Sequence, residues 1–180
     1  MRPVVAFAAA ATAAFGTVLV SCAGMGRPPD PGGSPVLGVF ERTGCLGACP
    51  AYRITVHENG VLLFQRLRDE AGGNDREPLR GRRLSRRELA SLTRAFESAG
   101  FASMSDYDRD DCTDYQMVTI EWRGHTVVHY WGDQHAPKGL YDLEGTFDRI
   151  ADSRRWLGTD PHTAGPDATY CEGGLSEGED

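Results

Sequence analysis

The chain has no excess of positive charge. Its 180 residues carry 19 Lys and Arg against 26 Asp and Glu, a formal net charge of -7. Proteins that bind nucleic acid through a broad basic field have the opposite balance, so we expect no nucleic-acid partner. Five arginines before and into an expected helix form a local exception. We interpret this cluster as a solvated face, with a site for an anionic lipid or polymer as the alternative: Arg80, Arg82, Arg83, Arg86 and Arg87.

The chain also lacks the short motifs that mark common catalytic sites. It contains no zinc-protease helix, no phosphate loop and no dinucleotide fingerprint, and its single Gly-x-Ser-x-Gly, at residues 174–178, is in the acidic tail. Several aspartates gather in residues 106–114, but the glycine and the closing glutamate of a calcium loop are absent. The sequence therefore leans away from an enzyme and predicts no cofactor and no metal. Hydrolysis by paired carboxylates leaves no sequence signature and stays an open alternative.

Long apolar runs are scarce, and the longest one, residues 4–20, is near the chain start. At roughly 17 residues it is at the short limit for a membrane span. The segment Leu19-Val20-Ser21-Cys22 looks like the lipobox of a bacterial lipoprotein signal peptide, in which the cysteine becomes the lipidated N-terminus after cleavage. We therefore predict a signal peptide at 1–21 and a palmitate-bearing anchor at Cys22 that holds an exported protein on a membrane of the bacterial cell envelope. An ordinary secretory signal cut near Ala23 and a membrane-spanning anchor are the alternatives.

Composition divides the remainder of the chain into three parts. Residues 22–35 are rich in glycine and proline and predict a flexible tether. Residues 36–157 contain the periodic apolar patterns and predict a single domain. Residues 158–180 form an acidic, glycine-rich tail that we predict to be mostly disordered.

Within the domain, alternating apolar residues predict two hairpins. Residues 36–43 and 52–57 are expected strands, and Asn59-Gly60 favours a tight turn into a return strand at 61–67. Residues 79–84 predict a polar edge strand. The second hairpin is expected at 117–122 and 126–131, around Arg123-Gly124.

Two helices are expected beside these strands. Ser85 and Glu88 form a capping box at the start of the first helix, and Gly100 is placed to end it. The second helix is expected from about Leu140 to Trp156, with an apolar stripe along one face. The fold class predicted is α+β: an antiparallel sheet of five to six strands with both helices packed on one face, in the order βββ(β)-α-ββ-α.

Four cysteines remain beyond Cys22, and an exported chain with an even number of cysteines favours disulfides. We favour Cys45 with Cys49 because the loop between them is short, and by elimination Cys112 with Cys171. The alternative is a thiol redox or copper site. Cys-x-x-x-Cys-Pro also resembles the copper motif of thioredoxin-like chaperones, and His129 or His135 would complete such a site. The strand pattern that follows the motif argues against this alternative.

Few other residues carry a chemical signal. His125 and His129 are four residues apart on a strand and share a face with Val127 and Trp131, and we interpret them as packed or surface histidines rather than ligands. Thr113 and Asp114 precede a strand, where Asp114 either caps backbone amides or points into a cleft. With Tyr52 they are the candidate binding residues.

Together, Gly44-Cys-x-Gly-x-Cys-Pro-x-Tyr52, the Asn59-Gly60 turn, the Ser85 helix, Thr113-Asp114, and Pro137 ahead of a helix with Leu143-Glu144 resemble a bacterial envelope domain family of unknown function. The resemblance covers residues 39–156 and implies secreted or lipid-anchored proteins with no established activity. We therefore expect a non-enzymatic envelope lipoprotein that binds an unknown protein or cell-wall partner.

Overall fold

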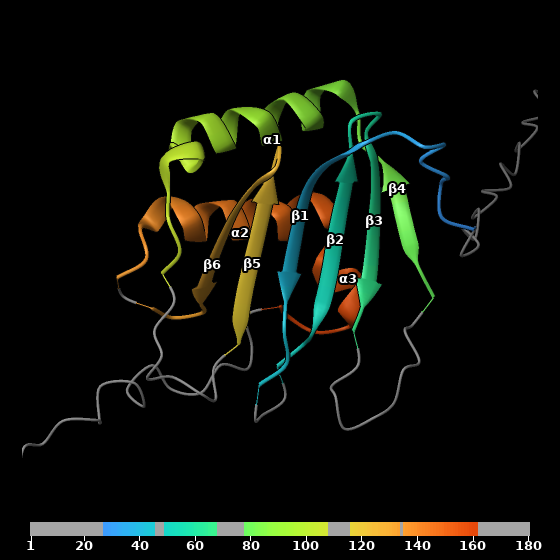
Figure 1. Cartoon of the computed structure of the whole chain (residues 1–180). Helices are drawn as coiled ribbons and strands as arrows, with labels where there is room; N and C mark the ends of the chain where they lie inside the picture. Colours follow the sequence, from blue (N-terminus) through green and yellow to red (C-terminus); the bar gives the residue numbers. More distant parts are fainter. Residues whose placement is uncertain (1–26, 46–48, 68–77, 108–115, 134, 162–180) are drawn as a thin grey trace, which may run out of the picture.

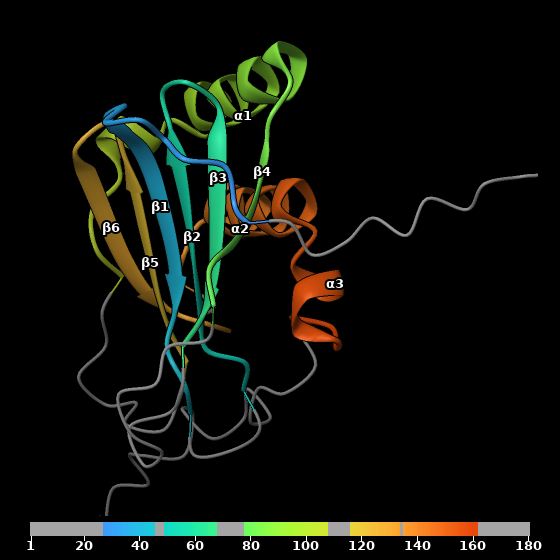
Figure 2. The same cartoon turned by 90° about the vertical axis from the view of Figure 1, so that its right-hand side faces the viewer.

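The computed structural model describes residues 27–45, 49–67, 78–107, 116–133 and 135–161, and its centre is one antiparallel sheet (Figure 1). The six strands lie in the order β4-β3-β2-β1-β5-β6. Their bounds are β1 Val36–Arg42, β2 Tyr52–His57, β3 Val61–Arg66, β4 Arg80–Arg83, β5 Met117–Trp122 and β6 His125–Tyr130. Both long helices lie on the same face of this sheet (Figure 2). The predicted α+β class is confirmed.

Strand alternation divides the sheet into a buried face and an open face. Phe40, Ile54 and Ile120 are fully buried beneath the helices. Their sequence neighbours point to the opposite side, where Glu41 and Arg53 pair across strands at 2.8 Å. Glycine is required at position 38, where β1 pairs with β5, because a Cβ there would lie 2.5 Å from Trp122 Cε3. The open face has no described helix over it (Figures 1 and 2).

The first helix, α1 Arg86–Ala99, begins and ends at its predicted caps. The Glu88 amide donates to Ser85 Oγ at 3.2 Å, and Glu88 Oε2 accepts from the Ser85 amide at 2.8 Å. Gly100 ends the helix at φ 66°, a conformation that costs glycine little. A single 3₁₀ turn, η2 Phe101–Ser103, follows and buries Phe101.

The prediction of one continuous second helix is wrong, because two helices occupy that range. These are α2 Lys138–Ala151 and the short α3 Ser153–Leu157. Asp152 separates them at φ 55°, and its amide donates to carbonyls of the last turn of α2. Aspartate tolerates this left-handed conformation better than most residues. The change of chain direction at Asp152 lets Trp156 Nε1 donate to the Ala151 carbonyl at 2.7 Å.

The segment before β1 is fastened to the β2–β3 hairpin. Asn59 Nδ2 donates to the Pro31 carbonyl at 2.9 Å, and the Asn59 amide donates to Ser34 Oγ at 3.1 Å. The Glu58 amide donates to the Pro35 carbonyl at 3.0 Å. Within the predicted tether 22–35, residues 31–35 are therefore held on the domain. No helix among the described residues is long and apolar enough to cross a membrane.

Candidate functional site

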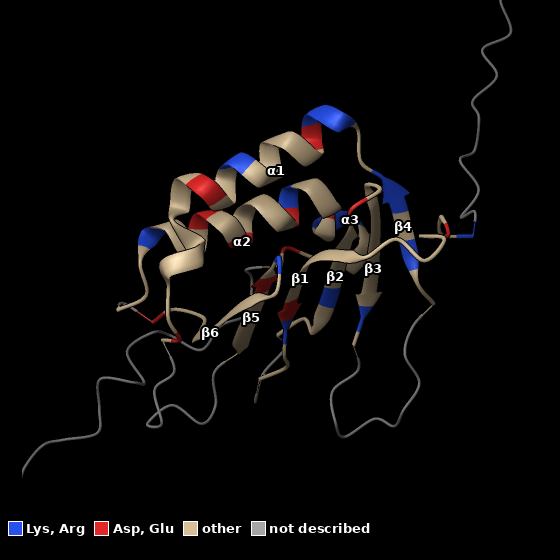
Figure 3. Cartoon of the chain, turned by 45° about the horizontal axis from the view of Figure 1, so that its top comes forward, with Lys and Arg blue, Asp and Glu red and all other residues tan. Residues whose placement is uncertain are grey.

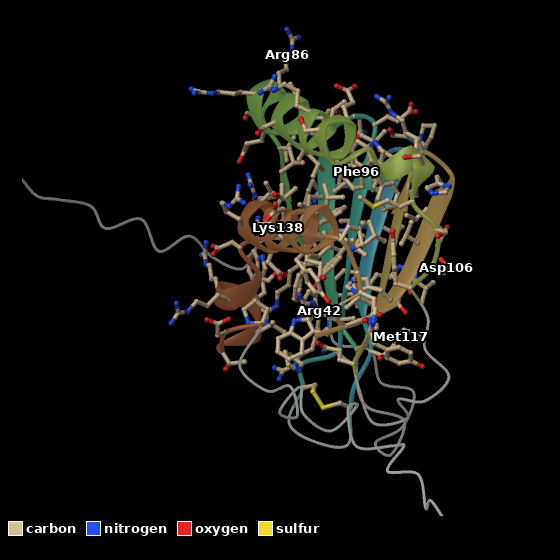
Figure 4. All side chains as sticks on the ribbon, turned by 90° about the vertical axis from the view of Figure 1, so that its left-hand side faces the viewer. Arg42, Arg86, Phe96, Asp106, Met117 and Lys138 are labelled. Atoms are coloured by element: carbon tan, nitrogen blue, oxygen red, sulfur yellow. A yellow bond between two sulfur atoms is a disulfide. The ribbon has the colours of Figure 1, made fainter. Side chains whose placement is uncertain are left out.

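Five side chains meet between the sheet and α2 and form what we call the buried charge cluster: Arg42, Tyr52, His129, Glu144 and Asp148. The first three come from the helix-facing sides of β1, β2 and β6. Glu144 and Asp148 are four residues apart on α2, so they share one face of the helix. Figure 4 shows Arg42 between the helix layer and the lower end of the sheet, above the disulfide.

Arg42 lies at the centre of the cluster. Its Nη2 is 2.5 Å from Glu144 Oε2 and 3.6 Å from Asp148 Oδ2. Its Nη1 donates to Gln116 Oε1 at 3.3 Å and to the Pro161 carbonyl at 3.4 Å. Arg42 and Glu144 are 0% and 1% exposed, so their charges are stabilised by each other and by hydrogen bonds rather than by bulk water.

Tyr52 connects β2 to the same cluster. Its hydroxyl donates to Asp148 Oδ1 at 2.6 Å. Burial raises the pKa of Tyr52 far above its ordinary value, more than the nearby Arg42 charge lowers it, and the Asp148 carboxylate raises it further. The phenol therefore keeps its proton and acts as a donor. Tyr141 beside His129 has a pKa raised to about 12, mainly by burial and then by the charge of Glu144.

His129 contacts an acceptor through each ring nitrogen. Nδ1 lies 3.1 Å from the Tyr130 carbonyl oxygen, and Nε2 lies 3.1 Å from Glu144 Oε1. The contact with Glu144 joins β6 to α2 through a fully buried ring.

The predicted disulfide between Cys45 and Cys49 is confirmed, with Cα atoms 5.5 Å apart. It closes the connection between β1 and β2 directly beside the cluster. Gln116 Nε2 donates to the Thr43 and Pro50 carbonyls, both at 2.9 Å, on the two sides of the bridge. The corner is therefore fixed by a covalent bond and by one buried amide that also accepts from Arg42.

The other predicted site residues lie in different surroundings. Tyr52 is fully buried and contacts α2 through Asp148. His135 has an exposed side chain whose Nδ1 lies 3.1 Å from Asp133 Oδ1. Among the described residues, no group of three or more His, Cys, Asp or Glu side chains is arranged so that it could hold a metal ion. The remaining predicted positions are outside the described residues: Cys22, Cys112, Thr113, Asp114 and Cys171.

Sequence reasoning did not predict the charge cluster, although a signal for it was present. On α2, Glu144 and Asp148 directly follow the buried Leu143 and Phe147, so they extend the apolar stripe rather than the solvent face. On β1, Arg42 shares the helix-facing side with Phe40. Charged residues at buried positions of two elements predict partners for each other.

Comparison with known proteins gives a family without a function. A model of the family described as Domain of unknown function (DUF6438) matches residues 39–151, which is more than half of the chain. This range includes the disulfide corner, all five residues of the buried charge cluster, and α1. No curated protein is matched.

Proposed function

The chain belongs to the DUF6438 family, so its function has to be inferred from its own geometry, and we propose a non-enzymatic lipoprotein of the bacterial envelope. In this proposal Cys22 carries the lipid, and the domain binds an envelope protein through the open face of its sheet. The envelope location is supported by the lipobox-like segment at 19–22 and by the disulfide, a bond typical of exported proteins.

The observation that carries the binding role is the open face itself. Most of its outward side chains are half-buried or exposed, while Val39, His57 and Val61 are buried: Glu41, Arg53, Thr55, Leu63, Gln65, Met117, Thr119, Glu121, Thr126, Val128 and Tyr130 are the half-buried or exposed ones. They form a mixed surface of apolar, hydroxyl and charged groups across five strands. Met, Tyr and Arg, all present here, are enriched in protein interfaces, so the chemistry favours a protein partner.

The interior supports a rigid binding module. The five ionisable side chains of the buried charge cluster contact one another, and each is at most 7% exposed. They join three strands to α2, while the disulfide fixes the adjacent corner. A sheet held in this way changes little on binding, so less ordering entropy opposes association.

Site-specific photo-crosslinking in intact cells tests the binding role. We expect a crosslinking amino acid at Thr55 or at Thr119 to capture the same envelope protein, because both positions lie on the open face. Ser91 and Ser98 are matched controls on the exposed side of α1. Equal capture from all four positions, or none from the open face, would contradict the proposal.

A thiol redox or copper-handling role at Cys45 and Cys49 is the second candidate, since the two sulfur atoms are adjacent. Cys49 is only 6% exposed, and His129 would have to leave Glu144 or Tyr130 to bind a metal. We expect the bridge to resist mild reductant. Tight Cu(I) binding by the reduced chain that is lost in Cys45→Ser/Cys49→Ser would instead support the second candidate.

A further inference from the structure

Seven arginines gather at one edge of the sheet, which we call the β4 edge: Arg80, Arg82, Arg83, Arg86, Arg87, Arg154 and Arg155. They come from β4, the start of α1, and α3. Figure 3 shows the basic residues of β4 and of the α1 start together at this edge, although the whole chain carries a net charge of -7. The distribution of charge is therefore strongly uneven.

Contacts bring these three elements together. Arg82 donates to the Ile150 carbonyl near the end of α2 at 2.6 Å and pairs with Glu88 of α1 at 2.7 Å. The Arg80 and Arg155 guanidinium groups lie over the Trp156 ring, 5.5 and 5.1 Å from its centre. These contacts hold several positively charged side chains along one edge of the sheet.

Two of these arginines are in positions that do not favour helix stability. Arg86 and Arg87 are exposed in the first turn of α1, next to the positive end of the helix dipole. Acidic residues are favoured there and cations are not. Among the described residues neither arginine has an acidic partner, so their placement is better explained by an external anion than by folding.

The described N-terminal segment begins at this same edge. A Cβ on Gly81 of β4 would lie 3.3 Å from Pro29 Cδ, so the chain before β1 passes directly over β4. Six residues lie between Cys22 and Pro29, and the seven Cα–Cα steps that join them span at most about 25 Å when fully extended. The opposite edge, β6, lies five strand spacings away, which adds roughly 24 Å. A lipid on Cys22 would therefore hold the β4 edge nearest to the membrane.

We propose that the β4 edge docks on the anionic phospholipid headgroups of the membrane that holds the lipid anchor. This inference rests on the proposed lipid anchor at Cys22. Arginines attract anionic lipid only within about one Debye length, roughly 8 Å at physiological salt, and a connection of at most about 25 Å to Cys22 lets them approach that closely. Docking by this edge places the sheet on its side, so that the open face stays accessible to a partner.

Vesicle flotation of the full chain carrying Cys22→Ser tests the surface without the lipid. Phosphatidylcholine vesicles measure the binding contributed by the apolar N-terminal run, and added phosphatidylglycerol measures the arginines. We expect phosphatidylglycerol to increase binding at low salt and high salt to remove the increase. Arg86→Glu/Arg87→Glu should lower the phosphatidylglycerol-dependent partition on the order of tenfold.

The matched control is Arg123→Glu/Lys138→Glu, which makes the same charge change away from the β4 edge, at the β5–β6 turn and the α2 start. It should keep the phosphatidylglycerol-dependent binding. The Arg86→Glu/Arg87→Glu variant should unfold at the same or higher urea concentration, because glutamate suits the first turn of a helix. Loss of binding then cannot come from loss of folding.

Equal flotation with both vesicle types, or equal loss in both variants, would overturn the inference. Retention on duplex DNA as strong as on the vesicles would assign the surface to a general polyanion and also overturn it. Palmitate labelling of Cys22 is independent of the arginines. A labelled chain with no phosphatidylglycerol effect would remove only the docking surface, whereas an unlabelled chain that still binds these vesicles would remove only the anchor.

Discussion

Replacing Arg42 by methionine should destabilise the domain severely. The change removes the guanidinium that contacts both Glu144 and Asp148 and leaves a flexible side chain that fills part of its volume. Glu144 is 1% and Asp148 7% exposed, so water cannot replace the lost cation. Removing one partner of a buried ion pair costs about 3–5 kcal/mol, a large share of the roughly 5–15 kcal/mol typical of a whole domain.

Arg53→Met is the matched control for this prediction. Arg53 pairs with Glu41 at 2.8 Å, a similarly short contact, but the two side chains are 46% and 28% exposed. Exposed pairs of this kind contribute less than about 1 kcal/mol. Urea unfolding followed by far-ultraviolet circular dichroism measures both variants. If Arg42→Met loses no more stability than Arg53→Met, the cluster does not join the sheet to α2 as we describe.

A double variant, Arg42→Met/Glu144→Met, separates burial of charge from loss of packing. Replacing a buried ion pair by apolar residues of similar volume is often neutral or stabilising. The double variant should therefore be more stable than Arg42→Met alone, although Asp148 and His129 still lose contacts. An additive loss would show that the cost of Arg42→Met comes from packing rather than from the unpaired carboxylate.

Three further perturbations follow from the same contacts. Cys45→Ser/Cys49→Ser should lower the free energy of unfolding by about 2 kcal/mol, since the loop it opens is short, and no measurable change would contradict a stapling role. Tyr52→Phe should cost about 1–3 kcal/mol at neutral pH, because Asp148 loses a donor. Since the pKa of Tyr52 is raised, this contribution is complete below pH 10 and is lost as the pH rises further, so alkaline unfolding should be steeper in the wild type than in the variant. Hydrogen bonds from Arg82 and Ser85 lower the pKa of Glu88 from 4.5 to about 2, so its contribution is present above pH 4.5 and lost as the pH falls towards 2. The stability difference between the wild type and Glu88→Gln should narrow across that window, and a constant difference would contradict the capping role.

The local parts of the fold are predictable because neighbouring residues decide them. The hairpin at Asn59-Gly60 forms, with Gly60 but not Asn59 at positive φ, and the Ser85–Glu88 capping box forms as its short motif indicates. The break at Asp152 is different. Its left-handed backbone is stabilised by hydrogen bonds from its amide to carbonyls at the end of α2 and by the hydrogen bond from Trp156 to Ala151. No residue within the apolar stripe signals this break in the sequence.

The buried charge cluster could not be assembled from local patterns. Arg42 and Glu144 are separated by 102 positions, and the contact requires β1 to lie in the middle of the sheet with α2 above it. His129 shows the same limit. The strand pattern placed it on the face of Val127, where it is buried, but the oxygen atoms next to its two nitrogens come from α2 and from its own strand.

The conformation of the predicted tether also depends on tertiary contacts. Glycine and proline in residues 22–35 are compatible with a free linker, yet Asn59 and Glu58 of the hairpin hold residues 31–35 by hydrogen bonds. A composition argument gives the flexibility of an isolated chain and cannot include acceptors supplied by a distant turn. These hydrogen bonds, with the approach of Pro29 to β4, place residues 27–35 at the β4 edge and thereby relate the arginines to the proposed anchor.

The proposed function and the docking surface both depend on a lipid at Cys22 that holds the domain on a membrane. Labelling cells with radioactive palmitate, followed by fractionation of the wild type and Cys22→Ala, tests this anchor most directly. We expect label on the wild type in the membrane fraction, and no label together with release from that fraction for Cys22→Ala. An unlabelled wild type, or a Cys22→Ala chain that stays fully membrane-bound in high salt, would contradict the claim.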